Sequence, residues 1–187
     1  MITQDILRTY ALEPGGALKK VIACYRSPGV HAVIVFRFGH WLLARSFPIK
    51  LLLTPLYLGL DHHIRATWGI EVQRRANIGV GFYIGHYGGI FVSGRATIGK
   101  YCNISQDVTI GVAGEGAARG VPQIGNNVYM GPGAKLQGKI HIGNNVRIGP
   151  NAVVTRSIPD DALVHIHPMQ IVVFPGRYAN DEPPASD

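Results

Sequence analysis

The stretch IGNNVYMGPGAKLQGKIHIGNNVRIGPNAVV, residues 124–154, carries an aliphatic residue or a methionine at every sixth position. The repeated positions are Ile124, Met130, Leu136, Ile142, Ile148 and Val154. A period of six matches neither the roughly 3.6 residues per turn of an α-helix nor the simple alternation of a strand. It matches a triangular β-solenoid, in which each face takes about six residues and each coil about 18. This stretch therefore predicts a solenoid whose aliphatic residues point inward.

The same spacing runs back to about residue 70. Aliphatic residues fall six apart at Val72, Ile78, Ile84 and Ile90, and then, in a shifted phase, at Val92, Ile98, Ile104 and Ile110. Corners of such a coil need backbone conformations that glycine and asparagine adopt most readily. The pairs Asn126-Asn127 and Asn144-Asn145 suit these corners. Cys102 falls on a small inward position, which favours a core role over that of a nucleophile.

Residues 111–123 (GVAGEGAARGVPQ) are the one place where we expect the six-residue repeat to fail. The segment has four glycines and no apolar run, so it predicts an extended loop that leaves the solenoid. Long loops inside compact repeats are often functional. We call residues 111–123 the excursion loop.

The N-terminal region, residues 1–69, is expected to be helical, because its apolar side chains mostly follow helical spacing. Pro28, Pro48 and Pro55 are expected to divide it, since proline ends or kinks a helix. Its most apolar run, residues 49–60, is twelve residues long and falls short of the roughly 20 that span a bilayer. We favour a helical layer that packs on its own domain or on a neighbouring subunit, and the alternative is a peripheral membrane contact. The basic residues that would support a membrane contact are Arg37, Arg45 and Lys50.

Composition narrows the class of protein. With 187 residues, 47% of them hydrophobic and 16% charged, the chain can bury a core, and disorder is excluded for most of it. The net charge of +7 permits an anionic partner, but no zinc-finger spacing, basic heptad or aromatic RNA-binding pattern points to nucleic acid. Two cysteines cannot form a disulfide framework and no signal-peptide pattern opens the sequence, so a cytoplasmic protein is expected. Residues 160–187 leave the repeat and are expected to form a C-terminal extension and tail.

The repeat resembles the left-handed β-helix acyltransferases, and it looks most like their serine O-acetyltransferase branch. The segments that carry the resemblance are FRFGHWLLA (36–44), IGHYGGIFV (84–92), ISQDVTIG (104–111), MGPGAKLQGKIHIG (130–143) and IGPNAVVTRSIPDDA (148–162). The resemblance implies a mainly β fold, a left-handed parallel β-helix of hexapeptide repeats with an N-terminal helical segment. The expected regions are the helical segment 1–69, the β-helix acyltransferase domain 70–159 and the extension 160–187.

The family's catalytic histidine, in an Asp-His-x-x-Gly segment, falls on His86, and its partner aspartate falls on Glu71, fifteen positions earlier. An imidazole can take the proton of an acceptor hydroxyl as that hydroxyl attacks a thioester, and a carboxylate on the second ring nitrogen fixes the tautomer. Glu71 is one methylene longer than aspartate, so this role requires the backbone to compensate. Tyr87 is the neighbouring candidate for a contact with the acceptor. The structural alternative is a solvated histidine, the usual state at an outward position of the repeat.

The resemblance also implies acetyl-CoA, held in the groove between coils of adjacent subunits. The small residues expected along the pantetheine arm are Gly131, Gly133 and Ala134. A backbone amide near Gly111 is the candidate for the thioester oxyanion. Lys135 and Arg147 are candidates for the CoA phosphates, and ordinary solvated charge is the alternative. Family members are trimers, so we expect a homotrimer in which His86 of one chain meets the excursion loop of a neighbour.

This chain departs from the family pattern at the positions that would bind the acceptor. The aspartate before the catalytic histidine is replaced by Gly85, and the Arg-His-Pro of the long loop by Gly120-Val121-Pro122, although Arg119 could substitute. Losing a carboxylate clamp disfavours a zwitterionic amino acid, because charge-assisted hydrogen bonds are the strong ones. A neutral sugar hydroxyl would not need the clamp. The favoured acceptor is therefore a sugar hydroxyl of a surface polysaccharide or its precursor, and the alternative is L-serine, giving the O-acetylserine of cysteine biosynthesis.

Two other classes of solenoid protein are alternatives. A zinc enzyme of the γ-carbonic anhydrase type needs histidines five apart, and none of the eight histidines has that spacing, so no metal is expected. Asp61-His62-His63 and the pair at 165 and 167 lack further ligands. A non-catalytic solenoid that serves as a scaffold or binding module would have regular repeats, and the excursion loop together with His86 favours an enzyme.

Overall fold

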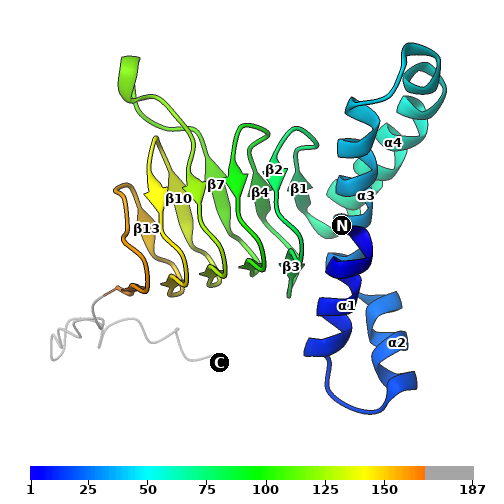
Figure 1. The fold of residues 1–187 in the computed structure, drawn as a ribbon, viewed down its shortest axis with the longest axis horizontal. Coiled ribbons are helices and arrows are strands. Elements are labelled where there is room, and N and C mark those ends of the chain that lie inside the picture. The colour runs from blue at the N-terminus through cyan, green and yellow to red at the C-terminus, as the bar shows by residue number, and fades with distance from the viewer. Residues whose placement is uncertain (167–187) are drawn as a thin grey trace, which may run out of the picture.

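A computed structural model describes residues 1–166, in which four helices precede a parallel β-solenoid (Figure 1). The helices are α1 (Ile2–Leu12), α2 (Ala17–Arg26), α3 (Pro28–Leu43) and α4 (Phe47–Trp68). The solenoid has three faces, each a parallel sheet built from strands of successive coils. This confirms the predicted mainly β fold, a left-handed parallel β-helix behind a helical segment.

Each coil runs through the three sheets in turn, so the prism has an A–B, a B–C and a C–A corner. Sheet A contains β1 (Ile70–Val72), β4 (Ile90–Val92), β7 (Thr109–Gly111), β10 (Lys135–Gln137) and β13 (Val153–Val154). Sheet B contains β2 (Asn77–Ile78), β5 (Thr97–Ile98), β8 (Gln123–Ile124) and β11 (His141–Ile142). Sheet C contains β3 (Tyr83–Ile84), β6 (Asn103–Ile104), β9 (Tyr129–Met130), β12 (Arg147–Ile148) and β14 (Leu163–Val164).

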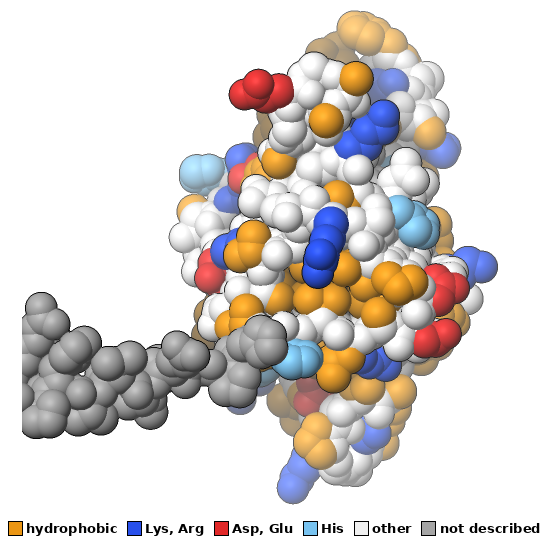
Figure 2. All heavy atoms as spheres, turned by 90° about the vertical axis from the view of Figure 1, so that its left-hand side faces the viewer, with side chains coloured by type: hydrophobic (Ala, Val, Ile, Leu, Met, Phe, Trp, Pro, Cys, Tyr) orange, Lys and Arg blue, Asp and Glu red, His pale blue; other side chains and the backbone are white. Residues whose placement is uncertain are grey.

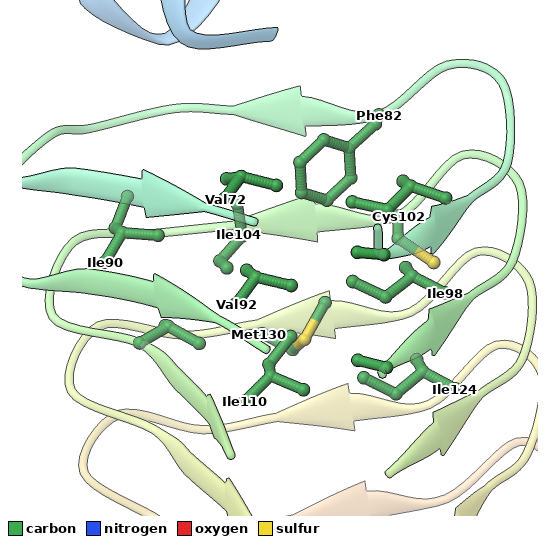
Figure 3. Packing of buried hydrophobic residues seen from close by; sticks show 14 of the residues in the cluster. Val72, Phe82, Ile90, Val92, Ile98, Cys102, Ile104, Ile110, Ile124 and Met130 are labelled. Atoms are coloured by element: carbon green, nitrogen blue, oxygen red, sulfur yellow. The ribbon is translucent and has the colours of Figure 1, made fainter. Parts of the chain in front are cut away.

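The core is a column of the predicted inward residues. Three members of this column are each at most 2% exposed and come from the three different faces of the solenoid: Ile98, Ile104 and Ile110 (Figure 3). Cys102 is fully buried beside them, its thiol donates to the Gly125 carbonyl at 3.2 Å, and burial raises the pKa of that thiol. Both facts agree with its expected core position, since a thiol whose pKa is raised is a poor nucleophile.

The B–C corner uses the asparagines as predicted. Asn127 (φ 54°) and Asn145 (φ 58°) adopt the left-handed conformation that the corner requires. The Asn127 amide donates to Asn145 Oδ1 at 2.9 Å, and the Asn145 amide donates to Asp161 Oδ1 at 2.8 Å. Side-chain ladders therefore stabilise this corner across three coils.

The repeat is interrupted twice, so the expectation of a single interruption was wrong. Ile84 pairs with Ile104 and Phe91 with Thr109, so residues 85–89 fill the same C–A corner that residues 105–107 fill in the next coil. The corner that contains His86 therefore has two extra residues. The second interruption is the excursion loop, which is closed at its base by a bridge between Ala113 and Gly120.

The prolines act differently from one another. Pro28 starts α3 and Pro48 lies in the first turn of α4, but Pro55 lies inside α4 and does not divide it, contrary to expectation. Because proline has no backbone N–H, the carbonyl of Leu51, four residues before Pro55, lacks its helical hydrogen bond. Both residues are exposed, so water can solvate that carbonyl. No helix within residues 1–166 combines the length and the apolar character needed to cross a bilayer.

The two ends of the solenoid differ. Helices α1 and α3 cover its first coil (Figure 1), whereas the last coil presents hydrophobic side chains at the centre of its end face (Figure 2). A hollow of about 660 Å³ lies there, lined by residues such as Val154, Ile158 and Val164. Strand β14 pairs with β12, so the last coil continues past the expected boundary at residue 159. Most of the expected tail, residues 167–187, lies outside the described residues.

Candidate active site

His86 lies in the enlarged C–A corner, directly after β3. Gly88 (φ 99°) and Gly89 (φ 64°) adopt positive φ angles that let the chain bulge there, and the Asp107 amide donates to the Gly88 carbonyl at 2.7 Å. The imidazole is exposed and forms no hydrogen bond, ion pair or ring contact with any residue of 1–166. Its nitrogens are therefore free to accept a proton from a bound molecule.

Glu71 lies in the middle of β1, opposite Phe91 of β4. Its Oε1 accepts a hydrogen bond from Gln73 Nε2 at 3.1 Å, on the side of the A–B corner. The expected hydrogen bond between Glu71 and His86 is not formed. Glu71 lies on β1 of sheet A, whereas His86 lies in the C–A corner that leads into the neighbouring strand β4, and the Glu71 carboxylate is engaged by Gln73.

The surroundings of His86 lack the carboxylate of the family pattern. A Cβ at Gly85 would lie 3.0 Å from Cε1 of the Tyr83 ring, so the tyrosine occupies part of the space that an aspartate would need. Burial is the main cause that raises the pKa of Tyr83, which keeps its hydroxyl protonated at neutral pH. Tyr87, the expected acceptor contact, is 58% exposed at the same corner.

The small residues expected along the pantetheine arm lie at the C–A corner between β9 and β10, and all three are buried: Gly131, Gly133 and Ala134. A Cβ at Gly131 would lie 2.8 Å from the Ile148 carbonyl oxygen, and one at Gly133 would lie 2.0 Å from Asn151 Oδ1. Close packing between coils of the same chain therefore requires these glycines, whether or not a cofactor lies beside them.

The structure does not bring the two expected phosphate ligands together. Lys135 Nζ forms an ion pair with Asp107 at 3.0 Å beside the C–A corner. Arg147 lies on sheet C and donates to the Asn127 carbonyl at 2.9 Å. Both cations are already engaged within the chain, and they lie on different faces, as their spacing of 12 residues in a six-residue repeat requires.

Gly111 and the excursion loop lie at the opposite edge of sheet A from His86. Gly111 ends β7, pairs with Gln137 and leads directly into the loop, which projects away from the solenoid (Figure 1). A three-residue strand spans about 10 Å, so His86 and the loop of one chain flank the same face without meeting. Arg119 is exposed in this loop, immediately after the 3-10 turn Gly116–Ala118.

Sequence reasoning missed a line of cations along the A–B corner, which we call the basic edge. From the first coil to the last, its members are Arg74, Arg75, Arg95, Arg119, Lys139 and Arg156. None of them forms an ion pair with another residue of 1–166. The strand register places Arg75 next to Arg95 of the following coil, 20 residues later. The sequence does not show this contact, because it requires the length of that coil to be known.

A cleft of about 410 Å³ lies beneath the excursion loop, beside the basic edge. Its walls include Ala113, Gly114 and Ala118 of the loop and Gly138, Lys139 and Thr155 of the following coils. Lys139 Nζ has only a long contact of 3.5 Å, to the Ala117 carbonyl. Among residues 1–166, no three side chains of the metal-binding types gather into a metal site.

Comparison with known proteins agrees with this geometry. The family described as "Bacterial transferase hexapeptide (six repeats)" matches residues 122–156. A serine acetyltransferase from Entamoeba histolytica, solved in complex with cysteine, superposes with a TM-score of 0.73 at 30% identity, covering 97% of this chain and 63% of that chain. The chain has the left-handed β-helix fold of the hexapeptide-repeat acyltransferases that it resembles.

Other serine acetyltransferases are also similar over most of the chain. The serine acetyltransferase of Synechococcus elongatus is 37% identical over 158 residues, which cover 84% of this chain and 59% of that relative. The serine acetyltransferase of Neisseria gonorrhoeae, in complex with serine, superposes with a TM-score of 0.72 at 28% identity, covering 91% of this chain and 67% of that one. The chain thus spans just under three fifths of the length of the Synechococcus relative.

Proposed function

We propose that this protein is an acetyl-CoA-dependent O-acetyltransferase whose acceptor is L-serine. The observation that carries the proposal is the imidazole of His86, which has no partner among residues 1–166 and lies on an enlarged corner of a hexapeptide solenoid. Serine acetyltransferases are the relatives that resemble this chain over four fifths of its length. The sugar acceptor favoured by the sequence has no support among these relatives and becomes the second candidate.

In the proposed reaction, a ring nitrogen of His86 accepts the hydroxyl proton of serine while the hydroxyl oxygen attacks the thioester carbonyl. The tetrahedral intermediate collapses with breakage of the carbon–sulfur bond, and the proton passes from the imidazolium to the departing thiolate. The products are O-acetylserine and CoA. Glu71 would act by positioning and charge once its carboxylate turns from Gln73 towards the ring, because β1 pairs with β4, the strand that follows the His86 corner.

Acetyl-CoA is proposed to lie along the cleft beneath the excursion loop. Lys139 and Arg156 lie at this end of the basic edge and have no ion-pair partner in the described part of the chain, so they replace Lys135 and Arg147 as the proposed phosphate ligands. The backbone around Gly111 remains the proposed oxyanion donor, because it borders the base of the same loop.

The site is proposed to be completed in a homotrimer. Within one chain, His86 and the excursion loop lie at opposite edges of sheet A. A neighbouring chain that packs against this face could bring its own loop to His86.

A cytoplasmic location remains a prediction, and so does a contact of α4 with a membrane or with another subunit. Helix α4 exposes hydrophobic side chains that could make such a contact, since Phe47 and Leu52 are each 76% exposed.

The second candidate acceptor, a neutral sugar hydroxyl, is favoured by one feature of the site. Gly85 and the Gly120-Val121-Pro122 segment provide no charged group for a zwitterion, and Tyr83 partly fills the place of the missing aspartate. For L-serine as the acceptor, Arg119 of the excursion loop is the proposed partner of the serine carboxylate.

The test is thiol release from acetyl-CoA by the purified protein with L-serine, His86→Ala as the variant and His141→Ala as the control. His141 is also an exposed histidine, but it lies on sheet B. We expect His86→Ala to lower kcat by about 100-fold to 10,000-fold and His141→Ala to change it less than about twofold. Acetyl-CoA turnover with sugars and not with serine would favour the second candidate. Serine turnover that survives His86→Ala would refute His86 as the base.

A further inference from the structure

A pocket of about 300 Å³ lies where α4 meets the A–B corner of the first coil. The side chains that matter are Tyr57, Asp61 and Arg65 from α4, and Glu71, Arg74 and Arg75 from the solenoid. We propose that this pocket binds a compact carboxylate that carries a neighbouring amino or hydroxyl group, that is, a small amino acid or hydroxy acid.

Arg74 provides the carboxylate-binding group. Its guanidinium stacks on the ring of Tyr57, 4.9 Å from the centroid, which holds the planar fork in one orientation. None of its N–H groups makes a hydrogen bond or an ion pair within residues 1–166. A planar fork with free donors matches the two oxygens of a carboxylate.

Tyr57 and Asp61 keep this arrangement in place. The Tyr57 side chain is buried, and its hydroxyl donates to Asp61 Oδ1 at 3.3 Å. Burial, with Asp61 as a second cause, raises the pKa of Tyr57 to about 12, so the hydroxyl remains a donor. Asp61 is further engaged by Arg65 at 2.8 Å, which leaves Arg74 and Arg75 as the unpaired cations of the pocket.

Glu71 provides the acceptor for the amino or hydroxyl group of the ligand. Its carboxylate accepts one hydrogen bond, from Gln73, and has lone pairs left for another donor. Two unpaired cations and one carboxylate give the pocket a net positive charge, so its complement is an anion that also carries a donor. A carboxylate on Arg74 with an amino or hydroxyl group towards Glu71 satisfies both.

The pocket shares Glu71 with the proposed catalytic pair, but it is separate from the proposed CoA phosphate site. Arg74 belongs to the first coil, whereas Lys139 and Arg156 belong to the fourth and fifth, and coils lie about 4.8 Å apart. Binding can be measured without acetyl-CoA, so the outcome does not depend on whether the protein transfers acetyl groups.

The experiment is titration of the intact protein with glycine, glycolate and acetate by calorimetry, at constant ionic strength set with sodium chloride. We expect saturable binding of glycine or glycolate and weaker binding of acetate, which lacks the second donor. Arg74→Gln should weaken that binding at least about tenfold, and Arg74→Lys, which keeps the charge without the fork, should weaken it less. The matched control is Lys100→Gln, an exposed cation of the B–C corner outside the pocket, with less than about a twofold effect expected.

Two results would overturn the proposal. One is the absence of saturation with both glycine and glycolate up to about 100 mM. The other is equal affinity in the wild type and in Arg74→Gln. Should Arg74→Gln fail to fold, Glu71→Gln serves instead: it should weaken glycine binding more than acetate binding, and an equal effect on both would count against the assigned orientation.

Discussion

Asp5 of α1 and Arg37 of α3 form a buried ion pair with a separation of 2.9 Å between Oδ2 and Nε. Both side chains are at most 4% exposed. Arg37 also donates to the carbonyls of Ile78 and Gly79, and Asp5 accepts from the Phe82 amide at 2.9 Å. The pair therefore joins two helices to the first coil of the solenoid and satisfies backbone groups there.

Removing one member of this pair should destabilise the fold strongly. Arg37→Met leaves the Asp5 carboxylate buried without its counter-charge, and we expect a loss of about 3–5 kcal/mol in the free energy of unfolding. Urea denaturation measures it. The control is Arg65→Gln, which breaks the more exposed pair with Asp61 and should cost less than about 1 kcal/mol. Equal losses in both variants would contradict a structural role specific to Arg37.

Gly29 sets the distance between α3 and the solenoid. A Cβ there would lie 2.1 Å from the Ile84 carbonyl oxygen, so Gly29→Ala should push the helix away and cost about 1–3 kcal/mol. Gly59 in α4 has nothing within 4 Å of its would-be Cβ, and Gly59→Ala should stabilise the protein by up to about 1 kcal/mol. Thermal melting compares the two. A stabilising Gly29→Ala would show that the helix does not approach the sheet so closely.

Asp160 should make the last coil sensitive to acid. The Asn144 backbone amide, and secondarily the Asn144 side chain, lower the pKa of this carboxyl by hydrogen bonding to its ionised form. A lowered folded-state pKa means that the stabilisation is present above the unfolded-state value near about 3.9 and is lost as pH falls through the lowered value. Melting temperature measured between about pH 5 and pH 2 should therefore fall less steeply for Asp160→Asn than for the wild type. Glu115→Gln, an exposed carboxyl of the excursion loop, should leave the slope unchanged.

Lys139 should affect the cofactor and not the acceptor. Loss of a charge-assisted contact to a CoA phosphate predicts that Lys139→Gln raises the KM for acetyl-CoA by about 5- to 20-fold, with kcat nearly unchanged. Lys100→Gln, an exposed lysine at the B–C corner, is the matched control. Steady-state kinetics with both substrates separates the effects. A rise in the KM for serine alone would exclude Lys139 from the cofactor cleft.

A shared site predicts complementation between two inactive variants. His86→Ala supplies an intact loop, and a variant with residues 114–119 replaced by two glycines supplies an intact His86. Random co-assembly should restore about one quarter of the wild-type activity, because one subunit interface in four then combines both intact parts. Tagged subunits verify that mixed trimers form. Mixed trimers without activity would refute the shared site, and a stable monomer in sedimentation would refute the trimer itself.

The candidate site was predicted in part. The position of His86 followed from the resemblance, but its enlarged corner follows from the register of Ile84 with Ile104 and of Phe91 with Thr109. The six-residue repeat already separates Lys135 and Arg147 by two faces, but only the structure shows that each is engaged by a different partner within the chain. The hydrogen bond of Glu71 to Gln73 depends on rotamers at the A–B corner, which no sequence pattern encodes.

The sequence by itself determined the solenoid, because an inward aliphatic residue must recur at every face and leaves a period of six, which neither an α-helix nor a simple strand produces. It also determined the corners at Asn127 and Asn145, since few residues adopt positive φ cheaply. Only the tertiary structure decided which charges meet. Arg75 and Arg95 become neighbours because the first coil takes 20 residues, and Arg74 acquires its pocket because α4 folds back against the A–B corner. Local periodicity fixes local backbone geometry, whereas contacts between side chains that are distant in the sequence depend on how many residues the coils and loops between them contain.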